Sequence, residues 1–220
     1  MILKADSDSY FVFDLDDTLY SEIDFLKSAY KSITYEIAPG IHEQLFEVMI
    51  ELFESGGNPF DYLIERFPEK KITKEKLLYL YRKHYPDISL REGVLEVLLR
   101  IKKKNGSVGI ITDGRSVTQR NKIKALGIEK YIDKAVISEE FGFEKPEPSV
   151  FKIFMEEGNG KKYYYFGDNI NKDFIAPRKL GWYCIGVSDK DNIRKQNLSD
   201  FSEAFLPHSF INSFTEIEII

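Results

Sequence analysis

The chain has 220 residues, of which 43% are hydrophobic and 30% are charged, and its formal net charge is −5. This composition is typical of a folded globular protein, and the length suits one α/β domain with a small insertion. The negative charge offers no extended basic surface, so we expect no nucleic-acid partner. Cys184 is the single cysteine of the sequence, which excludes an intramolecular disulfide.

No segment approaches the roughly 18 consecutive apolar residues that a membrane-spanning helix needs. The first residues, Met1 to Asp6, contain no apolar stretch of the kind found in secretory signal peptides. We therefore expect a cytoplasmic protein without a membrane partner.

A continuous apolar run from Tyr10 to Asp14 predicts the first strand. Its aromatic and β-branched residues favour a strand that is buried on both faces, as in a parallel sheet. The run ends on acidic residues, at Asp14, Asp16 and Asp17.

The pattern changes between residues 21 and 88, where helical spacing of apolar residues dominates and no buried strand is expected. Prolines and glycines divide this stretch into segments. Helices are predicted over Phe25 to Ile37, His42 to Phe53, Phe60 to Phe67 and Lys74 to His84. We expect residues 21–88 to form a helical cap that sits over the strand ends and closes over substrate as a lid.

Strand and helix patterns alternate in the rest of the chain. Further strands are predicted at Val108 to Thr112, Ala135 to Ile137, Tyr163 to Phe166 and Trp182 to Val187. Helices are predicted at Val94 to Ile101 and Val117 to Leu126, and the tail from Ser209 predicts a short edge strand. Such alternation is typical of a doubly wound parallel sheet. The predicted fold is α/β, with a Rossmann-like core of residues 1–20 and 89–220 and the helical cap inserted after the first strand.

Ligands of doubly wound sheets bind beyond the carboxyl ends of the strands. The acidic residues that directly follow predicted strands here are Asp14, Asp113 and Asp168. The sequence therefore places a candidate site at this edge of the sheet.

Four short motifs at these strand ends occur in the order found in the haloacid dehalogenase (HAD) superfamily, which the chain resembles from end to end. The first, Asp14-Leu15-Asp16-Asp17-Thr18, is similar to the Asp-x-Asp-x-Thr of the phosphatases in that superfamily. The others are Thr112-Asp113-Gly114, Lys145 before Pro146, and Gly167-Asp168 followed by Asp173. A single Asp-x-Asp would suit a turn or a helix cap equally well, whereas four motifs in order favour a common site.

The resemblance implies a phosphomonoester hydrolase in which Asp14 attacks phosphorus and forms an aspartyl phosphate. Asp16 would protonate the leaving alkoxide and later take a proton from the attacking water. The Thr112 hydroxyl and nearby backbone N–H groups would bind phosphoryl oxygens, and Lys145 would supply a fixed positive charge. The residues expected to bind the substrate phosphate after Thr112 are Asp113 and Gly114.

The expected site carries more negative than positive charge, so it requires a cation. Four carboxylates would converge against Lys145, and they are Asp14, Asp16, Asp168 and Asp173. Oxygen ligands suit Mg²⁺, which we expect as the cofactor. By resemblance the metal ligands would be the Asp14 carboxylate, the Asp16 main-chain carbonyl and Asp168, with Asp173 acting directly or through water.

Two other functions stay open at this point. A sugar-phosphate mutase of the same superfamily would use the same carboxylates, but such mutases carry a histidine after the first motif, where this chain has Leu19-Tyr20-Ser21. A non-enzymatic module that binds a phosphorylated metabolite would predict damaged motifs, and these are intact. The substrate is expected to be a small phosphorylated metabolite, without a choice among sugar phosphates, nucleoside monophosphates and phosphoglycolate-like acids. Monomer and homodimer are both open.

Several other polar residues have an ordinary structural interpretation. Asp17 is expected to make a turn hydrogen bond, and Cys184 to be a small buried hydrophobe. Asp113 stands where many relatives carry asparagine, so its carboxylate could tune substrate choice. The histidines, for which structural or surface roles are expected, are His42, His84 and His208.

Overall fold

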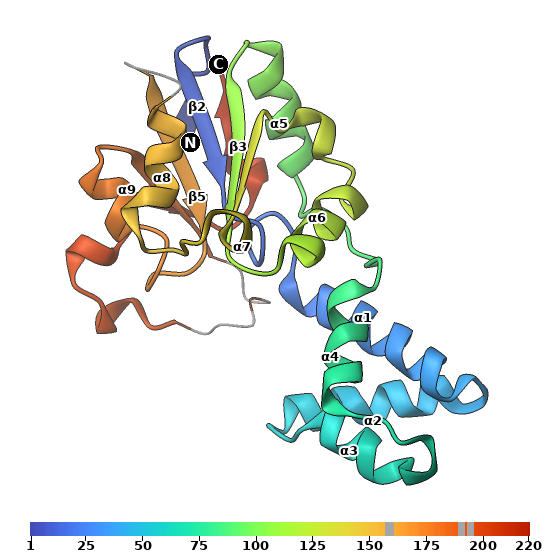
Figure 1. The fold of residues 1–220 in the computed structure, drawn as a ribbon. Coiled ribbons are helices and arrows are strands. Elements are labelled where there is room, and N and C mark those ends of the chain that lie inside the picture. The colour runs from blue at the N-terminus through green and yellow to red at the C-terminus, as the bar shows by residue number, and fades with distance from the viewer. Residues whose placement is uncertain (157–160, 189–191, 193–195) are drawn as a thin grey trace.

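The computed structural model describes residues 1–156, 161–188, 192 and 196–220. A six-stranded sheet with the order β4-β3-β2-β5-β6-β7 forms its centre, and every pairing in it is parallel (Figure 1). The strands are β2 (Ser9–Phe13), β3 (Ser107–Thr112), β4 (Lys134–Ile137), β5 (Lys162–Gly167), β6 (Tyr183–Val187) and β7 (Ser209–Ile211). The sheet confirms the predicted α/β class and the predicted edge strand.

Helices cover both faces of this sheet, with α5 and α6 on one face and α8 and α9 on the other (Figure 1). A shorter helix, α7, directly follows β4 and lies near the carboxyl end of β3. The bounds of these helices are α5 (Val94–Lys103), α6 (Ser116–Ala125), α7 (Ser138–Phe141), α8 (Pro148–Met155) and α9 (Ile175–Lys179).

The central strand β2 is buried along its whole length, as its apolar run predicts. Successive side chains point to opposite faces of a strand, so its residues divide between two apolar layers. Phe11 and Phe13 pack in the layer under α5, while Tyr10 and Val12 pack in the layer under α8. Stacked aromatic pairs with β5 bind the two central strands together, as in Phe13 and Phe166, whose ring centroids are 4.7 Å apart.

A bundle of helices follows the first strand, and it matches the predicted helical segments to within a few residues. Its members are α1 (Glu22–Ile37), α2 (His42–Glu54), α3 (Pro59–Arg66) and α4 (Lys74–Lys83). The bundle has an apolar cluster of its own, built around Ile33, Met49 and Leu63. We call α1–α4 the cap, and the domain boundaries at residues 21 and 88 stay a prediction.

The cap leaves the core at the edge where β2 and β3 end, and it extends away from the sheet beyond α6 (Figure 1). Its contacts with the core include hydrogen bonds from α6. The Thr118 hydroxyl donates to the Arg82 carbonyl at 3.0 Å, and the Asn121 amide donates to the His84 carbonyl at 3.3 Å. Closure of the cap over a substrate stays a prediction.

Two strand residues at each end of the chain form a separate small sheet that the sequence did not predict. β1 (Ile2–Leu3) pairs in parallel with β8 (Glu218–Ile219), so the two ends of the chain lie side by side. Two residues are too few for a periodic pattern to be recognised.

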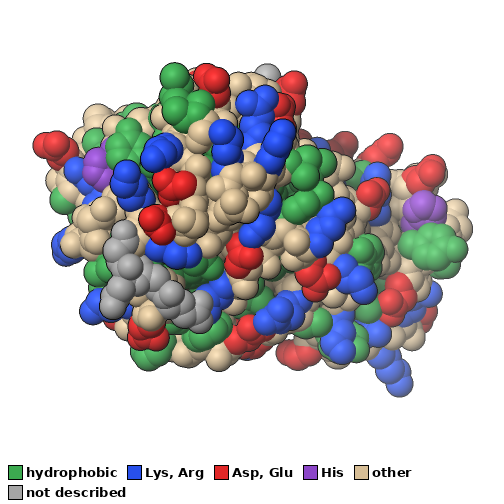
Figure 2. All heavy atoms as spheres, turned by 90° about the horizontal axis from the view of Figure 1, so that it is seen from above, with side chains coloured by type: hydrophobic (Ala, Val, Ile, Leu, Met, Phe, Trp, Pro, Cys, Tyr) green, Lys and Arg blue, Asp and Glu red, His purple; other side chains and the backbone are tan. Residues whose placement is uncertain are grey.

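No helix among the described residues combines the length and apolar character needed to cross a membrane. Acidic and basic side chains are interspersed on the face shown in Figure 2.

Candidate active site

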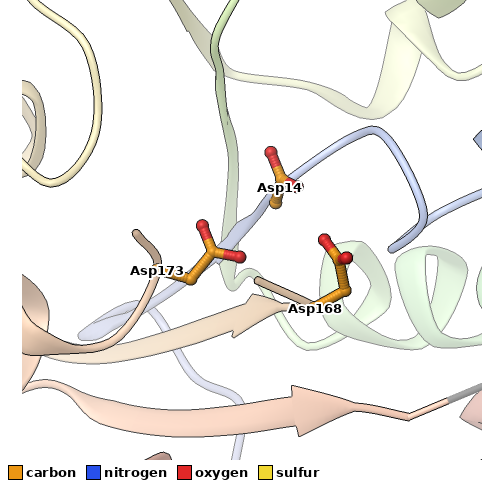
Figure 3. A group of neighbouring side chains, drawn as sticks. All are labelled: Asp14, Asp168 and Asp173. Atoms are coloured by element: carbon orange, nitrogen blue, oxygen red, sulfur yellow. The ribbon is translucent and has the colours of Figure 1, made fainter. Parts of the chain in front are cut away.

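Three aspartates meet at the carboxyl edge of the sheet, between the ends of β2 and β5 (Figure 3). Asp14 follows β2, and its backbone N–H donates to the carbonyl of Phe166 on β5 at 2.8 Å. Asp168 follows β5, and Asp173 lies a short loop further on. All three are buried, and each offers an oxygen within 4.8 Å of the others. The structure therefore brings together the predicted nucleophile and two predicted metal ligands.

Lys145 is buried between two of these carboxylates. Its Nζ lies 2.6 Å from Asp14 Oδ1 and 2.7 Å from Asp173 Oδ1. Burial opposes its charged form, but the charges of Asp14 and Asp173 outweigh this and raise the pKa of Lys145 well above its ordinary value. Lys145 is thus a fixed cation beside the predicted nucleophile, as expected.

Asp173 is held on both sides of its carboxylate. Oδ1 accepts from Lys145 and from the Tyr165 hydroxyl at 3.0 Å, and Oδ2 accepts from the Asn169 backbone N–H at 2.8 Å. Gly167 makes room for it, because a Cβ at that position would lie 2.5 Å from Asp173 Oδ2. Asp173 therefore anchors Lys145, and its role as a direct or water-mediated metal ligand stays a prediction.

Asp168 is the site carboxylate that has no hydrogen-bond partner among the described residues. Both of its oxygens are buried and accept no hydrogen bond from the described residues. Burial, followed by the charges of Asp173 and Asp14, raises the pKa of Asp168 to about 9, and burial is also the main cause that raises the pKa of Asp14 to about 7. The negative charges of these two buried carboxylates are unfavourable without a cation. Carboxylate oxygens are hard donors, so a divalent cation such as Mg²⁺ can bind them and neutralise this charge. The residues present fit the expected metal.

Three donors hold the Asp16 carboxylate: Gln119 and Lys122 on α6, and Tyr20 in the segment between β2 and α1. Oδ1 accepts from the Tyr20 hydroxyl and from Lys122 Nζ at 2.6 Å, and Oδ2 accepts from Gln119 Nε2 at 2.8 Å. Burial favours the neutral acid, but the Lys122 charge and these hydrogen bonds outweigh it and lower the pKa of Asp16.

The second motif lies at the end of β3. Thr112 is buried, and its hydroxyl accepts a hydrogen bond from Gln119. The Asp113 carboxylate accepts from the Lys145 backbone N–H at 3.0 Å and from Lys172 Nζ at 3.1 Å. The Gly114 backbone N–H donates to Ser138 Oγ at 2.9 Å. The Asp113 side chain thus orients the loop that carries Lys145, while phosphate binding at Asp113 and Gly114 stays a prediction.

Four residues of this network were missed by reasoning from the sequence, and they are Tyr20, Gln119, Lys122 and Tyr165. A signal existed for Gln119 and Lys122. Residues three apart lie on one face of a helix, and the helix that begins after a site strand directs one face to the strand ends. Tyr165 is a buried core residue, as its strand predicts, but its hydroxyl also reaches Asp173.

The residues with ordinary structural interpretations behave as expected. Asp17 Oδ1 accepts from the Glu22 backbone N–H at 2.8 Å, across a turn. Cys184 is buried, and burial raises the pKa of its thiol to about 12. His208 Nδ1 accepts from the Cys184 backbone N–H at 2.9 Å, and His84 Nδ1 lies 2.8 Å from the Tyr81 carbonyl. His42 packs its ring against Tyr35 at the edge of the cap.

A cavity of about 510 Å³ opens beside the second and third motifs. Its lining residues come from the loops that follow β3 and β4, and they are Gly114, Arg115, Ser138, Glu139, Gly142, Phe143 and Glu144. The lining includes Gly114 of the second motif and Glu144, which precedes Lys145, but not Asp14 or Asp168.

A parallel α/β core with a helical insertion and a buried aspartate–lysine site defines a class of hydrolases. The sequence model of the haloacid dehalogenase-like hydrolases matches residues 11–187, and the chain belongs to this family. The resemblance that the four motifs suggested is thereby confirmed.

Relatives and solved structures agree with this assignment. A glyceraldehyde 3-phosphate phosphatase of Methanocaldococcus jannaschii is 27% identical over 94% of this chain and 93% of its own length. One of Methanopyrus kandleri is 29% identical over 80% of this chain and 82% of its own length. The fold is similar to that of the HAD hydrolase YfnB of Bacillus subtilis, solved with bound magnesium, at a TM-score of 0.62 and 16% identity over 94% and 96% of the two chains.

Proposed function

We propose that this chain is a Mg²⁺-dependent phosphomonoester hydrolase that acts on a small phosphorylated metabolite through an aspartyl phosphate on Asp14. One observation carries the proposal: the buried carboxylate of Asp168, which has no partner among the described residues, lies beside Asp14, while Lys145 pairs with Oδ1 of Asp14. A site that pairs an anionic nucleophile with a fixed cation and with carboxylates able to hold a metal ion suits a phosphoryl dianion.

The proposed metal ligands are the carboxylates of Asp14, Asp168 and Asp173 and the main-chain carbonyl of Asp16. Mg²⁺ held there would supply positive charge to phosphoryl oxygens as negative charge builds up on them. Lys145 would supply a second positive charge from the other side, and the Thr112 hydroxyl would donate to a phosphoryl oxygen.

The reaction would proceed in two displacements at phosphorus. In the first, an Asp14 oxygen bonds to phosphorus, the ester P–O bond breaks, and the departing alkoxide takes a proton from Asp16. In the second, water bonds to phosphorus and gives a proton to Asp16, and the bond between Asp14 and phosphorus breaks. Lys122 favours the ionised form of Asp16, which suits the second step. The bound dianion of a substrate favours the protonated form that the first step needs.

For the substrate we propose a small sugar phosphate of the size of glyceraldehyde 3-phosphate. The names of the two archaeal relatives support this choice. We further propose that the enzyme works in the cytoplasm.

The test measures phosphate release from glyceraldehyde 3-phosphate and other phosphorylated metabolites, with and without Mg²⁺, and also monitors isomerised products. We expect release that requires Mg²⁺ and that falls by on the order of 10⁴-fold or more in Asp14→Asn. Asp8→Asn, an exposed aspartate just before β2, is the matched control and should keep full activity. Full activity of Asp14→Asn would rule out Asp14 as the nucleophile. Isomerised product without phosphate release would show that the protein is a mutase and not a phosphatase.

A further inference from the structure

One side-chain amide on α6 joins two groups of the proposed reaction. Gln119 Nε2 donates to Asp16 Oδ2 at 2.8 Å and also to the hydroxyl of Thr112. Gln119 and Thr112 are each 1% exposed, so solvent does not compete for these hydrogen bonds. The amide nitrogen has two hydrogens, and this arrangement uses one for each acceptor.

The orientation of this amide follows from chemistry. An ionised carboxylate has only acceptors, so the amide must present its nitrogen to Asp16 and turn its oxygen away. The Lys122 ammonium, 2.6 Å from Asp16 Oδ1, fixes the other oxygen of the same carboxylate. With the nitrogen so placed, Thr112 receives the second N–H and acts as the acceptor.

A hydroxyl that accepts a hydrogen bond still has its own hydrogen to donate. Because Gln119 occupies an acceptor position of Thr112, the hydroxyl hydrogen is directed elsewhere, which leaves it for a phosphoryl oxygen. The lone pair used by Gln119 also strengthens donation by the hydroxyl, since linked hydrogen bonds polarise one another.

Gly114 of the second motif makes this position of Gln119 possible. A Cβ at Gly114 would lie 3.3 Å from Gln119 Cδ and 3.4 Å from its Cγ, and the backbone φ of +140° also disfavours a side chain there. The glutamine side chain therefore passes close to the backbone of the motif on its way to Thr112.

We propose that Gln119 is a positioning residue that couples the proton-transfer group Asp16 to the phosphoryl-binding hydroxyl of Thr112. This inference rests on the proposed function and deepens it. Loss of the Gln119 amide would remove one hydrogen bond from Asp16 and one from Thr112, so both side chains would be less well oriented. Release of Thr112 weakens phosphoryl binding for every substrate, whereas release of Asp16 matters most when the leaving group is a poor one that needs a proton.

The test replaces Gln119 with methionine, which keeps the length of the side chain but has no N–H, and separately with glutamate, which has no hydrogens to donate when ionised. kcat/KM is measured with p-nitrophenyl phosphate and with an alkyl phosphate such as glycerol phosphate, because it covers the step in which the alcohol departs. In both variants we expect a fall of roughly 10-fold with the nitrophenyl ester and roughly 100-fold with the alkyl ester. Repeated in the Asp16→Asn background, the extra loss with the alkyl ester should disappear.

Lys124→Ala, an exposed change on the same helix, is the control and should leave both values unchanged. The inference is overturned if both Gln119 variants match this control. It is also overturned if their losses are equal for the two esters and persist undiminished in Asp16→Asn, since Gln119 would then act without Asp16. A wild-type protein that releases no phosphate from any ester would overturn the proposed function and the inference together.

Discussion

Among single residues, Lys145 has the largest influence on the charge balance of the site. Its Nζ is within 2.7 Å of two carboxylates, those of Asp14 and Asp173, and all three side chains are buried. Such an ion pair need not stabilise a protein relative to an apolar cluster, but removal of one partner leaves a buried charge uncompensated.

Lys145→Met should therefore reduce both stability and activity. We expect the free energy of unfolding to fall by about 3–5 kcal/mol in the absence of Mg²⁺, because Asp14 and Asp173 lose their cation. Mg²⁺ should recover part of this loss by binding the folded state. Urea denaturation with EDTA and with Mg²⁺ measures both effects. Lys172→Met, which removes a half-exposed lysine near the same loop, should cost less than 1 kcal/mol, as is usual for exposed ion pairs.

At this scale, motif spacing in the sequence was sufficient to predict which strand-end residues gather. Asp14, Lys145, Asp168 and Asp173 meet as expected because parallel strands place their carboxyl ends at one edge. The donors that hold Asp16 were not predictable in the same way. A buried glutamine or lysine on a helix resembles a solvent-exposed one until the tertiary contact is known.

Among the elements, β3 and α8 meet at a glycine where a side chain would clash with the facing helix. A Cβ on Gly109 would lie 2.3 Å from Cε1 of Phe154, which is itself fully buried. The close approach lets α8 lie flat on the sheet beside the site loops.

Gly109→Ala should overpack this contact and lower the free energy of unfolding by about 1–3 kcal/mol. Gly40→Ala is the matched control, because nothing lies within 4 Å of a Cβ there. Thermal unfolding of both variants checks the difference. Equal midpoints would show that α8 can shift at no cost, which contradicts this account of the packing.

The prediction of elements succeeded mainly where a pattern extended over several residues. The strands of the large sheet and the cap helices were identified from runs or spacings of apolar residues. The short helices α7 and α9 and the two-residue strands β1 and β8 were missed, because such lengths contain less than two repeats of a pattern. The eight-residue helix α8 was missed as well, although its buried residues Val150, Phe151 and Phe154 have helical spacing.

In the molecule as a whole, His84 lies at the junction of cap and core. Its ring is 4.7 Å from that of Phe25 on α1, and its carbonyl accepts from Asn121 on α6. Burial, together with the nearby Lys122 charge, lowers the pKa of His84 below its ordinary value, and the hydrogen bond to Tyr81 only partly opposes this.

The sign of the resulting pH dependence follows from proton binding. Below about pH 6.5 the unfolded chain binds a proton at His84 that the folded chain resists, so stability falls as the pH decreases through that range. One such group contributes at most about 1.4 kcal/mol per pH unit. In His84→Gln the fall in thermal midpoint between pH 7 and pH 5 should be shallower than in the wild type. Identical slopes for the wild type and His84→Gln would contradict the assignment.

The relation of the cap to the core was the least predictable feature at this scale. The sequence predicted the four cap helices, but the expected position over the strand ends differs from the extended arrangement beyond α6 (Figure 1). Helical periodicity predicts which face of each helix is apolar. The apolar faces of α1–α4 are mostly buried against one another within the cap. The apolar faces of these helices therefore say little about the position of the cap relative to the core.

The contacts of α6 with the cap bear on how freely caps can be exchanged. Thr118 and Asn121 recognise main-chain carbonyls, at Arg82 and His84, so these contacts depend on the path of the cap and not on its side chains. Lys122 instead recognises a side chain, because its Nζ lies 4.2 Å from the centre of the Phe25 ring. A chimera that grafts a foreign cap onto this core can thus vary the cap residues away from this junction. It has to retain the same chain path there, together with Phe25 and Tyr81, whose rings pack against the apolar cluster of the core.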